Sequence, residues 1–460
     1  MVHFTSLPAI QLSPRVRFST LLISQLFLLG FLLLINQTVS AQSAPVCDTT
    51  VAPANFEIDG NLYAKTMSSF SDDWFSNSSS SPGIGIIGQT AASAMPPLKI
   101  SAAAFKSLLQ AAVTVSQRNI RYEQRFSVPQ GTAQPAASGY GLIYDALAAR
   151  DNFSVNGAID SSIFTAGKNG DNPLTSWTVS TGSVSANSEI IDVGAHFRRQ
   201  YSALGVKGDI WGYGYATNLM ANGDVHYDFE FLRTQPVFNV NTGSVTVTGQ
   251  SLTGGHTRFY FDSTALATEV GDAIFSIDMS AGSLNPKVSV HVWVNPSNLG
   301  NGITSYADFN TKVNRPFEFT GSFTAGTGTN GYGYAEIRPK SNITTCVFYA
   351  RVNRFNSCQI PASPWGAIYG SNGSYQDSLA CQQFVEFSMD VTKFGLEGIV
   401  GNFDCNTPTA AMIVKTRDNS AFDANSVDFA GPYKLGNLAN AVAGVDQTRD
   451  CLHPTVTLEG

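Results

Sequence analysis

The sequence is poor in charge. Only 13% of its 460 residues are charged, with 27 Lys and Arg against 34 Asp and Glu and no run of basic residues. Charged residues make up about a quarter of typical globular proteins, and nucleic-acid-binding domains concentrate Lys and Arg on one face. A nucleic-acid partner is therefore not expected. The motifs G-x-S-x-G, H-E-x-x-H and Walker A are also absent, so no common hydrolase or nucleotide-binding class is indicated.

Closely spaced cysteines are absent as well. The six cysteines contain no C-x₂₋₄-C pair and are accompanied by no H-x₃₋₅-H pair, which argues against a structural zinc site. An even number of cysteines in an exported chain favours disulfides, with 15 connectivities open for six. Pairing between neighbours, with the two ends of the chain joined, is the preferred prediction: Cys346–Cys358, Cys381–Cys405 and Cys47–Cys451.

No apolar run reaches the length of about 20 residues that a membrane-spanning helix needs. The longest, residues 21–35, follows Arg15 and Arg17 and precedes the small residues Val39-Ser40-Ala41. This order is typical of a cleaved secretory signal peptide, and an uncleaved N-terminal anchor is the alternative. We therefore predict a signal peptide at 1–41 and an extracellular or cell-surface protein with no transmembrane segment after cleavage. One large domain with insertions is expected at 42–440, with a C-terminal extension or the start of a further module at 441–460.

Period-2 alternation of apolar and polar residues dominates the rest of the sequence. Residues 225–231, 287–294 and 384–391 each place apolar side chains on one face. Such strands are typical of antiparallel sheets with one face open to water. The fold class predicted is all-β, a large antiparallel β-sandwich of the jelly-roll or concanavalin-like kind. One amphipathic helix is expected at 101–117, with Ser101 as its N-cap, and a weaker helical piece at 142–149.

Three groups of side chains are candidates for a site. His226, Asp228 and Glu230 share the polar face of one predicted strand, where they are either ligand contacts, a Ca²⁺ site, a catalytic acid pair for glycoside hydrolysis (Asp228 and Glu230) or an ordinary solvated sheet face. Trp211 and Tyr213 form either a sugar-stacking platform or core packing.

Asp171 and Asn172 lie in a loop that either holds Ca²⁺ or simply turns. Calcium is the one candidate cofactor. Residues 83–88 match G-x-G-x-x-G but lack the following helix, which favours a glycine-rich strand edge over a nucleotide site.

Several segments together resemble a largely uncharacterised domain of secreted surface proteins from Bacteroidota-type bacteria. They occur in this order: residues 171–177, 208–213, 222–231, 269–279, 384–386, 415–417 and 428–432. The resemblance covers roughly Asn55 to Leu435. It implies a single sandwich domain that often precedes adhesion-type repeats and a type IX secretion signal, and it implies no catalytic residues. Ala216-Thr217-Asn218 stands where such domains usually have Ala-Asp-Arg.

These observations favour a secreted or cell-surface binding or adhesion protein that contacts an extracellular glycan or a surface protein. A glycoside hydrolase on a concanavalin-like sandwich and a purely structural surface module are the alternatives. Activity lost on Asp228→Asn or Glu230→Gln substitution would identify the enzyme. A glycan array probed with and without Ca²⁺ separates the binding protein from the structural module.

Overall fold

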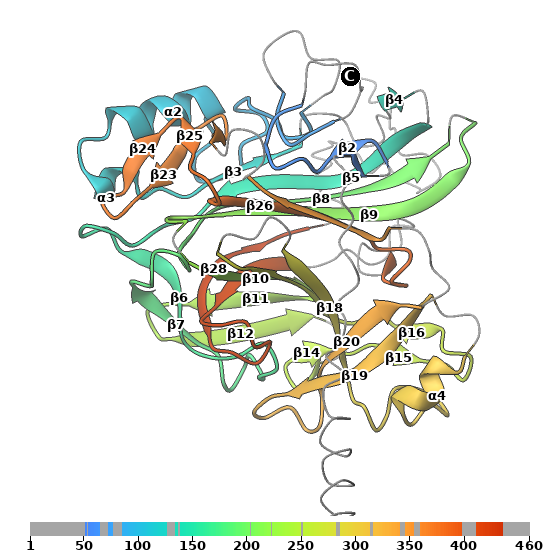
Figure 1. Cartoon of the computed structure of the whole chain (residues 1–460). Coiled ribbons are helices and arrows are strands. Elements are labelled where there is room, and N and C mark those ends of the chain that lie inside the picture. Colours follow the sequence, from blue (N-terminus) through green and yellow to red (C-terminus); the bar gives the residue numbers. More distant parts are fainter. Residues whose placement is uncertain are drawn as a thin grey trace, which may run out of the picture. The chain divides into compact units, whose positions relative to one another are not determined.

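Two antiparallel sheets form the body of the computed structural model (Figure 1). The structure describes residues 51–52, 54–64, 72–76, 85–126, 134–136, 139–202, 204–221, 223–249, 252–281, 286–312, 316–340, 346–353, 359–397 and 411–435. These all belong to one unit, Ser43–Gly460. The signal-peptide and C-terminal segments predicted at 1–41 and 441–460 lie outside the described residues.

The larger sheet has nine strands. In spatial order they are β19 (Phe317–Ala325), β20 (Gly333–Pro339), β18 (Lys287–Val294), β17 (Ala273–Met279), β10 (Val225–Leu232), β27 (Ala411–Arg417), β28 (Ser426–Tyr433), β6 (Asp160–Ala166) and β7 (Thr178–Gly182).

The second sheet has six strands in line, and a seventh, β4 (Gln134–Ala136), pairs with β5. In order the six are β21 (Phe348–Val352), β26 (Phe384–Asp390), β9 (Lys207–Asn218), β8 (Ile190–Tyr201), β5 (Gly139–Arg150) and β3 (Tyr122–Arg125). The all-β sandwich prediction is confirmed. The predicted helical piece at 142–149 was wrong, because these residues lie within β5, hydrogen-bonded to β8 on one side and to β3 and β4 on the other.

Six short two-stranded ladders complete the strands. They are β1 (Val51–Ala52) with β2 (Phe56–Glu57), β11 (Thr234–Asn239) with β12 (Ser244–Gly249), β13 (Leu252–Thr253) with β14 (His256–Thr257), β15 (Tyr260–Phe261) with β16 (Ala267–Glu269), β22 (Ile360–Pro361) with β25 (Ser378–Leu379), and β23 (Ala367–Tyr369) with β24 (Ser374–Gln376).

The inner faces of the two sheets meet in one apolar core. The alternating residues of β10, namely Val225, Tyr227, Phe229 and Phe231, pack in the same cluster as Val385, Phe387 and Met389 of β26. The rings of Phe229 and Phe387 lie edge to face, 4.9 Å between centroids. Burial of this apolar face is the main term that holds the sheets together, at about 25 cal/mol for each Å² removed from water. The predicted apolar faces are therefore the inner faces of the sandwich.

The outer faces of both sheets are also covered. All eight residues of β10 and all seven of β26 and β27 are buried. Described residues between Ala54 and Leu109 cover the second sheet through a second apolar cluster, and the hairpin β11–β12 covers part of the nine-stranded sheet through a third. The expectation that the polar faces meet water was therefore wrong. Alternation along a strand shows that its two faces differ in polarity, but it does not show whether other segments cover the polar face.

The predicted helix at 101–117 is two shorter helices. Helix α2 (Ala102–Ala111) has Ser101 as its N-cap, as predicted, and buries Phe105 and Leu109. It ends because Thr114 and Gln117 form a capping box that starts α3 (Val115–Arg118). Val113 is consequently 85% exposed rather than part of the buried stripe. The remaining described helix is α4 (Tyr306–Asn310), and no helix among the described residues is long and apolar enough to cross a membrane.

Two of the six cysteines, Cys346 and Cys381, lie in the described part of the chain, and neither is a free thiol. They flank opposite ends of the β21–β26 ladder, in which Phe348 pairs with Met389 and Val352 with Val385. This separation is too long for one disulfide to join them, since bridged Cα atoms lie within about 7 Å. Cys47, Cys358, Cys405 and Cys451 lie outside the described residues, so the individual pairings stay predictions.

Candidate functional site

Asp228 is held in an ion pair on the outer face of the nine-stranded sheet. Its Oδ2 accepts hydrogen bonds from Arg417 Nε and Asn169 Nδ2, each at 2.7 Å. Arg417 Nη2 also donates to Asp278 Oδ1 at 2.9 Å and to Ser276 Oγ at 2.8 Å. The register brings these groups together, because β10 lies between β17 and β27. Asp228 thus has an orienting guanidinium and no exposed surface.

Glu230 lies two residues further along β10, on the same face, and is also paired with a base. Lys415 Nζ donates to its Oε2 and Tyr334 Oη to its Oε1, each at 2.6 Å. The Lys415 ammonium also lies 4.6 Å from the centre of the Trp177 ring. Burial and then the Glu230 charge raise the pKa of Tyr334, so its hydroxyl stays a proton donor. We refer to Asp228, Glu230, Lys415 and Arg417 as the paired cluster.

The loops that cover the paired cluster bond to its members. Arg417 Nη1 donates to the carbonyl of Ala421 at 2.7 Å. Buried His256 lies 3.2 Å from Asp272 Oδ2 and 3.3 Å from the carbonyl of Asp171. His256 Nδ1 also lies 3.7 Å from Glu230 Oε1, so this histidine connects the paired cluster to the loop at Asp171, far away in the sequence. In this arrangement Asp228 and Glu230 face bases and loops rather than an open cleft.

The third residue of the predicted group, His226, lies at the margin of the cluster. Its Nδ1 is 2.8 Å from Asp278 Oδ1, and 7% of its surface is exposed. The structure therefore does bring His226, Asp228 and Glu230 to one face, where Asp278 and Arg417 join His226 to Asp228 and Glu230 has its own partner, Lys415. It differs from the expectation of a solvated face, since the group lies below covering loops.

Trp211 and Tyr213 lie on the other sheet. Both are 2% exposed and belong to the apolar cluster between β9 and residues 54–126. The Tyr213 ring packs against Phe56, 4.5 Å between centroids, and against His196, 5.3 Å away. This is the core-packing alternative of the sequence analysis, and neither ring offers a free face to a sugar.

Asp171 and Asn172 connect two loops. Asp171 accepts backbone N–H bonds from Thr327 at 2.7 Å and from Lys168 at 3.1 Å, one on each carboxylate oxygen. Asn172 accepts from the backbone N–H of Leu174 and donates to the carbonyl of Gly328. The side chains are thus engaged as turn and loop anchors, the alternative reading of this segment.

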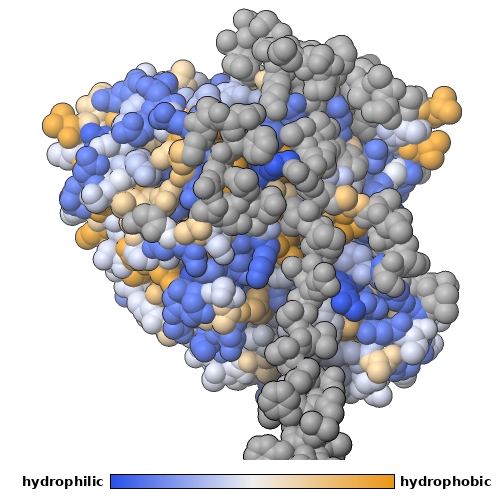
Figure 2. Space-filling model, in the orientation of Figure 1, coloured by the Kyte–Doolittle hydropathy of each residue, from blue (hydrophilic) through white to orange (hydrophobic). Residues whose placement is uncertain are grey.

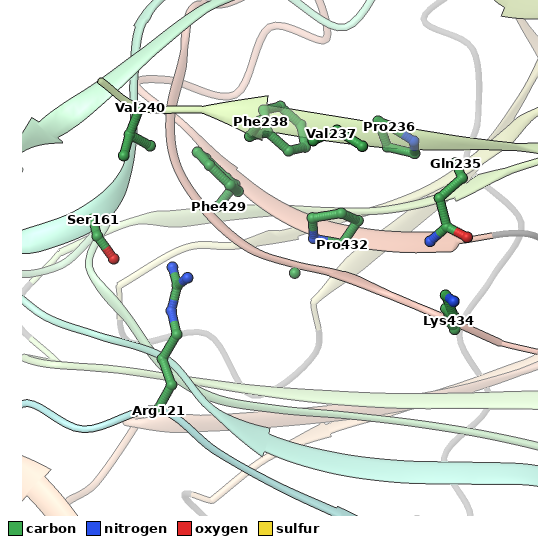
Figure 3. A pocket seen from close by; sticks show the side chains of 11 residues that line it. Arg121, Ser161, Gln235, Pro236, Val237, Phe238, Val240, Phe429, Pro432 and Lys434 are labelled. Atoms are coloured by element: carbon green, nitrogen blue, oxygen red, sulfur yellow. The ribbon is translucent and has the colours of Figure 1, made fainter. Parts of the chain in front are cut away.

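A cavity of about 480 Å³ lies between hairpin β11–β12 and strand β28 (Figure 3). Pro236, Val237 and Phe238 of β11 line it together with Phe429 and Pro432 of β28, and the Phe238 and Phe429 rings pack on each other, 4.5 Å between centroids. Figure 3 shows Arg121 reaching into the cavity from the side opposite β11. The volume is within the range of about 300–1,000 Å³ found for small-molecule sites. Sequence analysis did not identify this pocket.

The polar lining of this pocket is cationic. Among the described residues that line it, Arg121 and Lys434 are charged, Gln235 and Ser161 are neutral polar groups, and none is an acid. Arg121 Nε pairs with Asp151 Oδ1 at 2.7 Å, and its Nη2 donates to Ser162 Oγ at 2.7 Å. The Asp151 charge raises the pKa of Arg121, so the guanidinium is positive in a fixed orientation. Because Asp151 already pairs with Arg121, Lys434 is the lining cation whose charge is left for a ligand, and an ammonium group beside apolar walls suits an amphipathic anion.

Two further groups of three acids lie close together in the described part of the chain. Carboxylate oxygens of Asp160, Glu189 and Asp428 lie within 4.8 Å of one another, and all three residues are buried. We refer to these three as the acid cluster. A second group, Glu57, Asp59 and Asp73, has the same spacing next to Glu386, whose Oε1 accepts the backbone N–H groups of residues 59 and 60. Burial raises the pKa of Asp73 and of Glu386.

Comparison of this chain with protein-family models, with curated proteins and with solved structures finds no match.

The unpredicted residues of the two clusters differ in whether a sequence pattern indicates them. Lys415 and Arg417 alternate along one strand as Asp228 and Glu230 do along another, a complementary pattern that predicts cross-strand ion pairs. The acid cluster has no such pattern, because its members come from positions 160, 189 and 428 and meet only in the folded chain.

Proposed function

We propose that this protein is a secreted or cell-surface binding protein and that the pocket between β11 and β28 takes an acidic saccharide. The observation that carries the proposal is the lining of the pocket, which combines Pro and Phe surfaces with Arg121 and Lys434. Sugar rings stack on flat apolar side chains, and a sugar carboxylate pairs with a guanidinium or ammonium group. The signal-peptide pattern and the resemblance to surface proteins support an extracellular location.

The surface outside the pocket supports the same choice. Figure 2 shows apolar residues in several separate places on the face in view, mixed with polar ones. A broad apolar patch is the usual mark of a protein-docking surface. A small ligand held in a cavity therefore fits these residues better than a wide protein interface.

The hydrolase alternative has less support from the geometry. Asp228 and Glu230 are fully buried, and each accepts a hydrogen bond from a base at 2.6–2.7 Å. A glycoside hydrolase needs two carboxyl groups on either side of a bound sugar. Binding rather than cleavage is the function we propose.

A glycan array followed by calorimetry tests this proposal. The full secreted chain is expected to bind oligosaccharides that contain uronic acids and to ignore their neutral counterparts. Lys434→Ala should weaken binding about tenfold, the equivalent of about 1.4 kcal/mol. Lys312→Ala, which removes a cation outside the pocket, is the matched control. Binding that is equal for acidic and neutral sugars, or unchanged in Lys434→Ala, contradicts the proposed ligand class.

A further inference from the structure

The acid cluster has more negative charge than its surroundings neutralise. Asp151 lies beside the three residues and makes a fourth carboxyl, since Ser162 Oγ is 3.1 Å from Asp151 Oδ2 and 2.7 Å from Asp160 Oδ1. The base in contact with this group is Arg121, which is paired with Asp151. Among the described residues, four carboxyls therefore face one guanidinium, and all four acids are at most 1% exposed.

Neutral donors orient these carboxylates. Ser154 donates from N and Oγ to Glu189 Oε2, and Ser162 donates from N to Asp160 Oδ1 at 3.0 Å. The two oxygens of Asp428 accept the backbone N–H groups of Ile190 at 2.6 Å and of Phe429 at 2.7 Å. Such bonds hold the side chains in place but add no positive charge.

Two oxygens of the cluster have no partner. Asp160 Oδ2 and Glu189 Oε1 are both buried and neither accepts a hydrogen bond within the described structure. A buried carboxylate oxygen without a donor or cation costs free energy, because it has lost its water and gained nothing. Burial and then the charge of Asp160 raise the pKa of Glu189 and of Asp428.

We infer that Asp160, Glu189 and Asp428 bind a calcium ion. A divalent cation supplies the positive charge that the surrounding residues lack, and it takes up the two oxygens that have no donor. The ligands are all oxygen, with no His or Cys among them, which favours Ca²⁺ over zinc or copper. Calcium also accepts six to eight oxygens in flexible geometry, whereas Mg²⁺ needs near-ideal octahedral geometry and is usually held by only one or two carboxylates.

The position of this site connects it to the pocket. Asp160 precedes Ser161 on β6 and Asp428 precedes Phe429 on β28, and both following residues line the cavity. A bound ion would join β6, β28 and the start of β8, and so hold these pocket residues in register. The metal site is nonetheless independent of what the pocket binds.

Calcium titration of the full chain after EDTA treatment tests the inference. Calorimetry is expected to give saturable Ca²⁺ binding, and millimolar Ca²⁺ should raise the melting temperature above that in EDTA. Asp160→Asn should weaken Ca²⁺ binding by more than about tenfold, since even changes around metal ligands have effects of that size. Ser154→Ala, which removes one bond to Glu189 and keeps every carboxylate, is a milder variant with a smaller loss of affinity.

Asp73→Asn is the matched control, because Asp73 belongs to the other group of buried acids. It should leave the Ca²⁺ affinity that depends on Asp160 unchanged. The inference is overturned if the stripped protein shows no calcium heat and no thermal shift, or if Asp73→Asn abolishes binding while Asp160→Asn keeps it. Neither result bears on the glycan array, since that array is read in EDTA as well as in calcium.

Discussion

The paired cluster and the acid cluster are both buried groups of carboxylates, yet their surroundings are opposite. Asp228 and Glu230 each have a base at 2.6–2.7 Å, supplied by neighbouring strand β27. Asp160, Glu189 and Asp428 have serine hydroxyls and backbone N–H groups instead of bases. Buried oxygens without a donor occur in both clusters, namely Asp228 Oδ1 in the first and Asp160 Oδ2 and Glu189 Oε1 in the second. Buried acids therefore do not by themselves indicate a metal-binding site. What indicates one is an excess of negative charge over the positive charge of the neighbouring side chains.

The largest effect is expected from removing a base from the paired cluster. Arg417→Met leaves Asp228 buried without its counter-charge and should lower the free energy of unfolding by about 3–5 kcal/mol. The double variant Asp228→Asn with Arg417→Met should recover part of this loss, because no charge is then stranded. Urea unfolding of the two variants measures both values. If the double variant is no more stable than Arg417→Met, the ion pair is not the reason for the loss.

Removing one negative charge from each cluster sharpens the comparison. Glu230→Gln strands Lys415 and should destabilise the protein by about 3 kcal/mol. Glu189→Gln in EDTA removes repulsion between buried carboxylates and should instead stabilise the protein, a change of opposite sign. Thermal and urea unfolding at neutral pH give the signs. If Glu230→Gln and Glu189→Gln destabilise the protein equally, the acid cluster does not carry more uncompensated negative charge than the paired cluster.

At acid pH, protonation of His291 beside Arg417 should lower the free energy of unfolding. This side chain stacks on Phe422 at 3.7 Å, and burial followed by the Arg417 charge lowers its pKa from 6.5 to about 3. Between pH 6.5 and 3, the unfolded chain therefore binds a proton at His291 that the folded protein does not bind. Stability is therefore complete above this pH and falls as the pH drops towards 3, by about 2 kcal/mol near pH 5. His291→Asn should show a shallower decline in unfolding free energy between pH 6.5 and 4, and an unaltered decline would exclude His291 as its source.

The smallest effect tests a neutral member of the paired cluster. Tyr334→Phe removes the 2.6 Å hydrogen bond to Glu230 and leaves the Lys415 pair in place. The cost should be about 1–2 kcal/mol, the usual range for a bond to a charged group. Tyr332→Phe, a partly buried neighbour whose hydroxyl contacts Arg258, is the control in urea unfolding.

The strands were the part of this protein that its sequence predicted well. The segment 287–294 coincides with β18, and 225–231 and 384–391 coincide with β10 and β26 to within one residue. The period-2 pattern predicted these strand bounds because a strand that buries one face in the core needs every second side chain to be apolar. The helix was predicted less well, because the capping box of Thr114 and Gln117 interrupts an apolar stripe that reads as continuous.

The sites were harder to foresee. His226, Asp228 and Glu230 were identified as a group, but whether their face meets water depends on loops at 168–177 and 418–425. The pocket is built from positions 121, 161, 235–240 and 429–434, and no local pattern links these segments.

The amino-acid order alone determined the alternating strands, the N-cap at Ser101 and the face of each strand that enters the core, because these depend on neighbours within a few residues. The tertiary structure decided which polar faces are covered, which acid has a base beside it and which has none. Those outcomes depend on distances between residues hundreds of positions apart, and the free energy of a buried charge is set by what lies within a few ångströms of it.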